Sequence, residues 1–176
     1  SEMCKETGRR DDALNLLKRA VRSGETDPDA YLQLGNLLRE RRQPDKALQI
    51  HRGLAVRRDL VFEEEKEIQL AIADDLAALG KLDKAIQTLE AVSRRRRDAE
   101  ILRSLHVMYH RAGMYDRAFS TLREIGKTDP SIDRDVRAGY LAAVASDRLA
   151  AGKIDEARRY VERARRESGE SIPALW

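Results

Sequence analysis

The sequence holds very few cysteine, proline and aromatic residues. Of 176 residues, one is cysteine, four are proline and 5% are aromatic. A single cysteine, Cys4, excludes an internal disulfide and favours a reducing, cytoplasmic compartment. The shortage of aromatic rings argues against a surface that stacks nucleic-acid bases. Four prolines and ten glycines leave long stretches of the chain free to form helices.

Long apolar runs and a large charge excess are missing too. No apolar run approaches the roughly 18 residues of a membrane-spanning helix, and no signal peptide opens the chain. Charged residues make up 37% of the sequence, but the signs are interleaved and the net charge is only +3. Such a surface is well solvated and does not by itself indicate a nucleic-acid partner.

What the sequence does contain is a recurring motif, Gly-x-x-Asp-x-Ala. In one copy Arg42 stands in place of the glycine. Apolar residues follow each alanine at helical spacing, which predicts an amphipathic helix. The glycine is expected to end a preceding helix in a left-handed turn, and the aspartate to accept N–H bonds where the second helix starts. The motif alanines are Ala13, Ala47, Ala85, Ala118 and Ala157.

A second position supports paired helices. Twelve residues before each later alanine stand Gly35, Ala73, His106 and Ala145, three of which are small enough to let two helices approach closely. Helix pairs recurring at about 34 residues resemble the tetratricopeptide repeat. This resemblance implies an all-α, right-handed α-solenoid of about four and a half repeats. Extra residues in two copies are expected to lengthen the first helix of those repeats.

The expected repeat boundaries form one domain over residues 1–176. We expect a half repeat at 1–27, repeats at 28–61, 62–98, 99–131 and 132–170, and the start of a further repeat at 171–176. In that last stretch Pro173 matches Pro28 and Trp176 matches Tyr31. Because repeat arrays need polar capping units, cut ends are expected to expose apolar surface and to self-associate.

The repeat family implies a concave surface that binds a peptide or a folded protein partner. Asn36 matches one position of the carboxylate clamp found in chaperone-tail binders, but Leu32 stands where that clamp has a lysine. We therefore expect a mixed apolar and charged groove rather than that clamp. The predicted groove residues are Asp29, Leu32, Asn36, Arg39, Leu70, Asp74, Arg103, Val107, His110 and Ser146.

One passage, from Ala30 to Leu54, goes beyond the general repeat. Its Leu-Gly-Asn-Leu and Ile-His segments are similar to those of the lipopolysaccharide assembly protein B family. This resemblance implies a bacterial adaptor that presents the deacetylase of lipid A synthesis to a membrane AAA protease. The family also has an N-terminal membrane anchor and a C-terminal zinc module, and neither is present in these 176 residues. A tetratricopeptide scaffold of another pathway is the alternative.

A run of four arginines, Arg94, Arg95, Arg96 and Arg97, offers a different kind of function. Such a patch could dock an acidic partner, an anionic lipid or RNA. The plainer interpretation, which we favour, is a solvated junction with basic residues at a helix C-terminus. No nucleic-acid partner is therefore expected.

Other reactive side chains do not combine into a recognisable centre. His106 and His110 lie one helical turn apart, but two ligands are too few for a metal site, and His106 stands at the small-residue position. The carboxylates at 63–67 and at 74–75 are expected on helix faces in water. With no phosphate loop, catalytic triad or metal motif, we expect no catalytic residue, no cofactor and no metal. If the repeats were the substrate-docking arm of an enzyme, its catalytic domain would have to lie outside these 176 residues.

Overall fold

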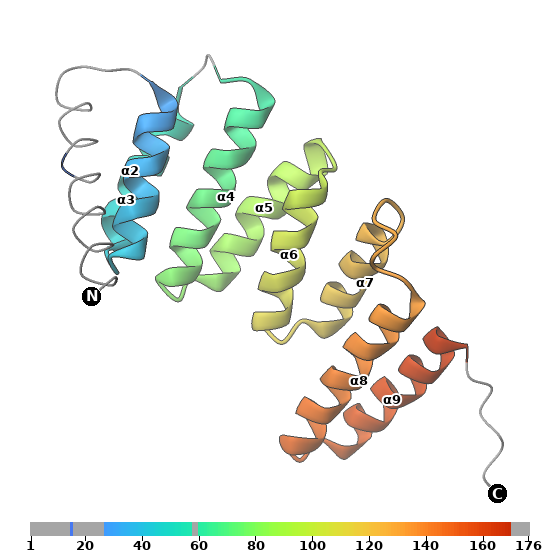
Figure 1. Ribbon diagram of the computed structural model, residues 1–176. Helices are drawn as coiled ribbons and strands as arrows, with labels where there is room; N and C mark the ends of the chain where they lie inside the picture. Colours follow the sequence, from blue (N-terminus) through green and yellow to red (C-terminus); the bar gives the residue numbers. More distant parts are fainter. Residues whose placement is uncertain (1–14, 16–26, 58–59, 170–176) are drawn as a thin grey trace, which may run out of the picture. The chain divides into compact units, whose positions relative to one another are not determined.

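The computed structural model describes residue 15 and residues 27–57 and 60–169. In this part of the chain the regular secondary structure is entirely α-helical. The helices are α2 (Pro28–Glu40), α3 (Pro44–Ala55), α4 (Phe62–Ala78), α5 (Leu82–Arg95), α6 (Ala99–Arg111), α7 (Tyr115–Ile125), α8 (Arg134–Ala150) and α9 (Ile154–Ser168) (Figure 1). They belong to two compact units, Ser1–Arg97 and Asp98–Trp176.

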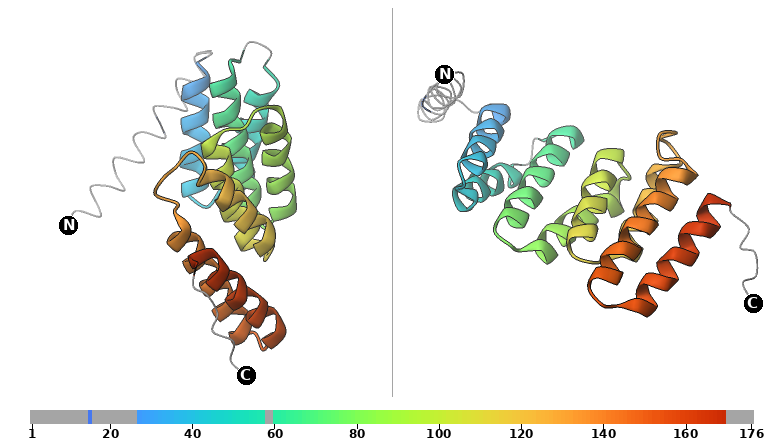
Figure 2. Two further views of the ribbon diagram at one scale, coloured as in Figure 1. Left: turned by 90° about the vertical axis from the view of Figure 1, so that its right-hand side faces the viewer. Right: turned by 60° about the horizontal axis from the view of Figure 1, so that its bottom comes forward.

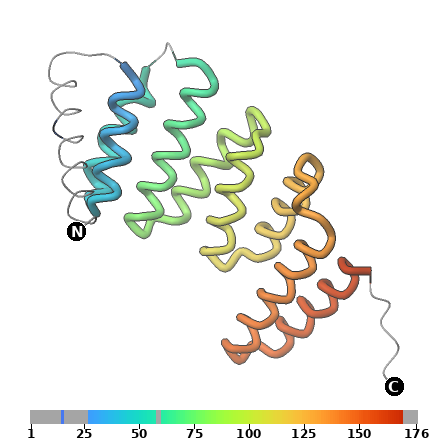
Figure 3. The backbone as a smooth tube through the Cα atoms, in the orientation of Figure 1, coloured from blue at the N-terminus to red at the C-terminus, as the bar shows by residue number. Residues whose placement is uncertain are grey.

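In each unit the helices pack as consecutive pairs. In the first unit α2 packs on α3 and α4 on α5, and α4 also lies against α3 and α2. In the second unit α6 packs on α7 and α8 on α9, and α7 also contacts α8 (Figure 2). The tube in Figure 3 traces the tight turn that joins the members of each pair. The expected all-α stack of helix pairs is confirmed.

The turns inside the pairs take the left-handed conformation predicted for the motif glycine. Gly80, Gly113 and Gly152 have φ of 73°, 71° and 73°. Arg42, which replaces glycine in the remaining described turn, has φ of 58° and is the one non-glycine residue with positive φ in the described part of the chain. An L-residue in this region costs free energy because its Cβ approaches the following carbonyl oxygen. The turn geometry is thus kept even where the sequence departs from the motif.

The motif aspartates do not cap their helices as expected. Each lies inside the first turn, and the residue at the N-cap makes no side-chain capping bond. Their carboxylates therefore act through the favourable interaction with the helix dipole rather than through a capping bond. The aspartates are Asp45, Asp83, Asp116 and Asp155, and the N-caps are Gln43, Lys81, Met114 and Lys153.

The uneven repeat spacing is explained by helix length. Helices α4 and α8 have 17 residues each, whereas α2 and α6 have 13. The extra residues thus lengthen the first helix of two repeats, as predicted. The described helix pairs fall inside the boundaries expected for the four whole repeats, which remain a prediction. The half repeat at 1–27 and the start at 171–176 lie outside the described residues, apart from residues 15 and 27.

Candidate functional site

A charged cluster lies in the interior of the first unit, where α2, α3 and α4 meet. The carboxylate of Asp75 on α4 is completely buried. Arg39 on α2 donates from one guanidinium nitrogen to Asp75 Oδ1 at 2.9 Å. His51 on α3, also completely buried, places Nδ1 2.6 Å from Asp75 Oδ2. One carboxylate from the second repeat is thus held by two side chains of the repeat before it.

The imidazole of His51 is bonded on both sides. Its Nε2 lies 3.2 Å from the carbonyl oxygen of Leu32, to which it donates. Nδ1 lies against Asp75 Oδ2, so each ring nitrogen has an oxygen within hydrogen-bond distance. A methyl group built on Gly35 would come within 2.2 Å of Nε2. Gly35 is small because the ring of His51 occupies the space that a side chain would fill.

The cluster reaches the surface of α2 and α4 through Arg39, whose side chain is 24% exposed. Its second guanidinium nitrogen donates to Asn36 Oδ1 at 2.9 Å and lies 3.7 Å from a carboxylate oxygen of Asp74. The first nitrogen also approaches the carbonyl oxygen of Ala71 at 3.4 Å. Because buried charges are costly unless paired and hydrogen-bonded, these contacts fix how α4 lies on α2.

This geometry corrects one expectation: Asp75 is not in water on a helix face, as the sequence suggested, but completely buried. Arg39 and Asn36, predicted as groove residues, are hydrogen-bonded to each other, and Arg39 also pairs with Asp75. Their place in a groove stays a prediction. The signal that could have revealed the cluster was His51, a polar residue at a position that is apolar in the other repeats, opposite the smallest residue, Gly35.

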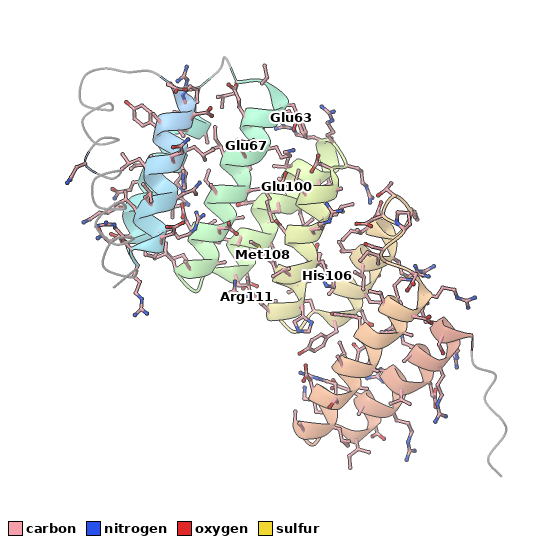
Figure 4. The ribbon with its side chains drawn as sticks, viewed as in Figure 1. Glu63, Glu67, Glu100, His106, Met108 and Arg111 are labelled. Atoms are coloured by element: carbon pink, nitrogen blue, oxygen red, sulfur yellow. The ribbon has the colours of Figure 1, made fainter. Side chains whose placement is uncertain are left out.

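The remaining predicted groove residues of the first unit lie on α2 and α4. Asp29 is exposed in the first turn of α2, and Asp74 has 54% of its side chain exposed. Leu32 and Leu70 are half-buried. Glu67, which is also exposed, stands on α4 (Figure 4). The structure thus brings together half-buried apolar side chains and exposed carboxylates on the first helices of two successive repeats.

In the second unit the predicted residues are divided between different surroundings. Arg103 donates to Asp129 Oδ2 at 2.8 Å, and hydrogen bonds from Ser131 and Arg103 lower the pKa of the Asp129 carboxyl below its usual value. Val107 is 53% exposed on α6. Ser146 is exposed and lines a cavity between α8 and α9. These side chains therefore do not converge on one centre.

The two histidines of α6 have structural partners. His106 points from α6 toward α7, where its Nδ1 donates to the carbonyl oxygen of Ala118 at 2.9 Å (Figure 4). Nδ1 of His110, a predicted groove residue, lies 3.1 Å from the hydroxyl of Tyr140, and the two rings meet edge to face. Burial raises the pKa of the Tyr140 phenol well above its usual value. Among the described residues, no group of three or more histidine, cysteine, aspartate or glutamate side chains could hold a metal ion.

The arginine run at the end of α5 is partly used within the first unit. Arg94 donates to the carbonyl oxygen of Glu90, Arg95 pairs with Glu65, and Arg96 stacks on the ring of Phe62 at 4.2 Å from its centroid. All four arginines are nevertheless exposed. The structure therefore gives these side chains neighbours but does not gather them around a common pocket.

The carboxylates at the start of α4 also have neighbours. Glu63, labelled in Figure 4, pairs with Lys66 at 2.6 Å, and Glu64 accepts a hydrogen bond from the backbone N–H of Val61. These are contacts of exposed and half-exposed carboxylates near a helix N-terminus, where negative charge is favoured.

Among the residues that the structure describes, no helix is both long enough and apolar enough to cross a bilayer.

Comparison with known proteins identifies the family of the chain. The tetratricopeptide repeat family matches residues 5–58 and 70–131. Lipopolysaccharide assembly protein B of Haemophilus influenzae is 29% identical over 103 residues, which is 58% of this chain but only 26% of that protein. The chain thus matches about a quarter of the length of that curated relative.

Solved structures show the same fold at low identity. The structure of MamA from residue 41 onward, from Desulfovibrio magneticus RS-1, is 17% identical with a TM-score of 0.61. The match covers 98% of this chain and 93% of the MamA chain. YrrB, a tetratricopeptide protein with an unusual peptide-binding site, is 15% identical with a TM-score of 0.59. The match covers 96% of this chain and 83% of the YrrB chain. Together with the family match over most of the sequence, these likenesses show that the chain belongs to the tetratricopeptide repeat family, a family of protein-interaction scaffolds.

Proposed function

We propose that the chain is a non-catalytic adaptor domain that binds a polypeptide on the exposed face of α2 and α4. The observation that carries this proposal is the buried contact of Asp75 with Arg39 and His51. It fixes the first helices of two successive repeats relative to each other. The surface that displays Asp29 and Asp74 is therefore organised before a partner arrives, which lowers the entropic cost of binding.

The chemistry of this surface suggests the partner. Half-buried Leu32 and Leu70 offer apolar contact area, and the exposed carboxylates offer charge-assisted hydrogen bonds. Because Arg39 already pairs with Asp75, the face carries a net acidic character. A polypeptide with apolar anchors and basic side chains complements it.

The more specific proposal is a regulator of the lipopolysaccharide assembly protein B type. In this role the domain would present the deacetylase of lipid A synthesis to a membrane AAA protease, at the cytoplasmic face of the inner membrane. The similarity to the Haemophilus influenzae protein and the Leu-Gly-Asn-Leu and Ile-His segments support it. A scaffold that serves another pathway is the alternative.

The test is direct binding of the purified deacetylase to the immobilised chain, measured by calorimetry or surface plasmon resonance. Asp29→Ala on α2 and Asp74→Ala on α4 each remove an exposed carboxylate of the proposed face. Each is expected to weaken binding by at least about fivefold, the effect of losing roughly 1 kcal/mol at an interface.

The control is Lys84→Ala, at an exposed position on α5, a second helix of its repeat. It should leave the affinity unchanged. Binding that is equally strong in all three variants would show that the deacetylase uses another surface. No binding of the deacetylase, with retention of other proteins sensitive to Asp74→Ala, would favour a scaffold of another pathway.

A further inference from the structure

A largely apolar cavity of about 550 Å³ opens between α8 and α9, which lie side by side in the second unit (Figure 1). Three of its apolar lining residues are unusually exposed for their type: Leu149 and Ile154 are each 60% exposed, and Val161 is 40% exposed. Most of the other lining residues are small, among them Ala145 and Ala157. We call this cavity the α8/α9 groove. Exposed apolar side chains that gather in one place mark a surface where a partner binds.

The first unit shows what kind of element such a surface receives. When the motif alanines are matched, α8 and α9 take the places of α2 and α3, so that Leu149 stands where Arg39 stands and Val161 where His51 stands. Arg39 and His51 both contact helix α4 through Asp75. In the second unit the residues that line the groove all come from α8 and α9 themselves. The α8/α9 groove is therefore shaped for a helix that the described part of the chain does not supply.

Two arginines of α9, Arg158 and Arg165, line the groove beside its apolar residues. Both are exposed, and neither guanidinium group makes an ion pair or a hydrogen bond with any residue that the structure describes. Their neighbours Arg163 and Arg166, by contrast, lie within ion-pair distance of carboxylates in the second unit. The α8/α9 groove thus offers a partner two guanidinium groups at the edge of an apolar surface.

The spacing of Arg158 and Arg165 specifies the partner further. They are seven residues apart, so they lie on the same side of α9 and about 10 Å apart along its axis. A second helix that lies along the groove presents its own residues at the same interval. Carboxylates seven residues apart beside an apolar stripe would each meet a guanidinium group, and such charge-assisted hydrogen bonds are stronger than neutral ones. On the opposite wall Ala142 and Ser146 carry no charge, so acidic residues are needed on one side of the stripe only.

We propose that the α8/α9 groove binds an amphipathic helix of a partner protein. The apolar stripe of that helix lies against Leu149, Ile154 and Val161, and two carboxylates seven residues apart bind Arg158 and Arg165. The concave shape of the groove fits a helix better than a flat bilayer, although the same arginines would attract anionic lipid. The inference concerns the second unit alone and does not depend on the proposed function, which places a basic polypeptide on α2 and α4.

The probes are three fluorescently labelled synthetic peptides that differ at two positions only. Each carries a leucine stripe at helical spacing, and the two residues beside that stripe, seven apart, are glutamate, glutamine or lysine, which have similar helix propensities. Binding to the 176-residue chain is measured by fluorescence anisotropy at low and at high salt. The glutamate peptide should bind at least about tenfold more tightly than the lysine peptide, with the glutamine peptide between them. The difference should shrink at high salt, because exposed charges are screened.

Charge reversal in the chain supplies the second part of the test. Arg158→Glu combined with Arg165→Glu should weaken binding of the glutamate peptide by at least about tenfold and strengthen binding of the lysine peptide. The matched control is Arg159→Glu, which reverses an exposed arginine of the same helix that does not line the groove, and it should leave both affinities nearly unchanged. Leu149→Glu places a charge among the apolar residues and should abolish binding of the glutamate peptide. Circular dichroism verifies that each variant is folded.

Three results would overturn the proposal. The first is a glutamate peptide that does not bind, or that binds no better than the lysine peptide. The second is binding of phosphatidylglycerol vesicles but not of the peptide, lost when Arg158 and Arg165 are changed, which would assign the groove to a membrane surface. The third is self-association that disappears in Leu149→Glu, again without peptide binding, which would assign the groove to a second copy of the chain.

Discussion

Nδ1 of His51 and Oδ2 of Asp75 lie 2.6 Å apart, and neither side chain has any exposed surface. His51 belongs to α3 and Asp75 to α4, so the contact joins two successive repeats rather than the two helices of one repeat. In repeat proteins the interface between neighbours supplies much of the stability. This pair therefore makes the interface depend on a polar contact that tolerates little change.

Removing either member of the pair should destabilise the first unit strongly. His51→Leu leaves Asp75 buried with Arg39 as its remaining partner, and a loss of about 3 kcal/mol in the free energy of unfolding is expected. Asp75→Leu should cost a similar amount. The double variant should lose less than the sum, by about 1–3 kcal/mol. Urea unfolding followed by circular dichroism measures all three, and strictly additive losses would contradict the coupling.

Gly35→Ala should act through the same imidazole. The added methyl would lie 2.2 Å from Nε2 of His51, which is held by Asp75 on its other side. A loss of about 2 kcal/mol is expected from this overpacking, and most of it should disappear when His51→Ala is present too. Gly53→Ala is the matched control, since nothing lies within 4 Å of the added methyl, and it should stabilise α3 by about 1 kcal/mol. Equal losses for Gly35→Ala in both backgrounds would refute the clash.

The features that the sequence predicts well are local and repeated. The left-handed turns, the paired helices and the longer α4 and α8 each follow from a pattern that recurs along the chain. At Arg42 the pattern even predicts the conformation against the preference of the residue. Periodicity is strong evidence here because each repeat confirms the others.

The contact of Asp75 could not be predicted in the same way. Its partners lie 24 and 36 residues away in the sequence and occur in one repeat only, so no periodic signal marks them. Two adjacent aspartates also look alike in the sequence, yet Asp74 is exposed and Asp75 is buried, because they point to different faces of α4. Which face is covered depends on how α4 lies on α2 and α3, and that is a property of the packed structure.

Arg42→Gly should stabilise the turn between α2 and α3. Arg42 has φ of 58°, where an arginine is disfavoured and a glycine is not. A gain of about 1 kcal/mol in the free energy of unfolding is expected. Arg42→Ala should change little, since alanine carries the same Cβ, and Gly80→Ala should show the reverse effect in the turn between α4 and α5. A stabilisation by Arg42→Ala equal to that by Arg42→Gly would assign the strain to the side chain instead.

Tyr140→Phe should have an effect that depends on alkaline pH. Near pH 8 the variant should be about 1 kcal/mol less stable, because Nδ1 of His110 loses the hydroxyl. Burial raises the pKa of the Tyr140 phenol in the folded state, so its contribution is fully present below the ordinary tyrosine pKa of about 10 and is lost as the pH rises above it. Phenylalanine cannot ionise, so the two stabilities should converge between about pH 10 and 11. Urea unfolding of both proteins from pH 8 to about pH 11 measures the difference in the free energy of unfolding. A difference that stays constant over this range would show that the pKa of Tyr140 is the same in the folded and unfolded states.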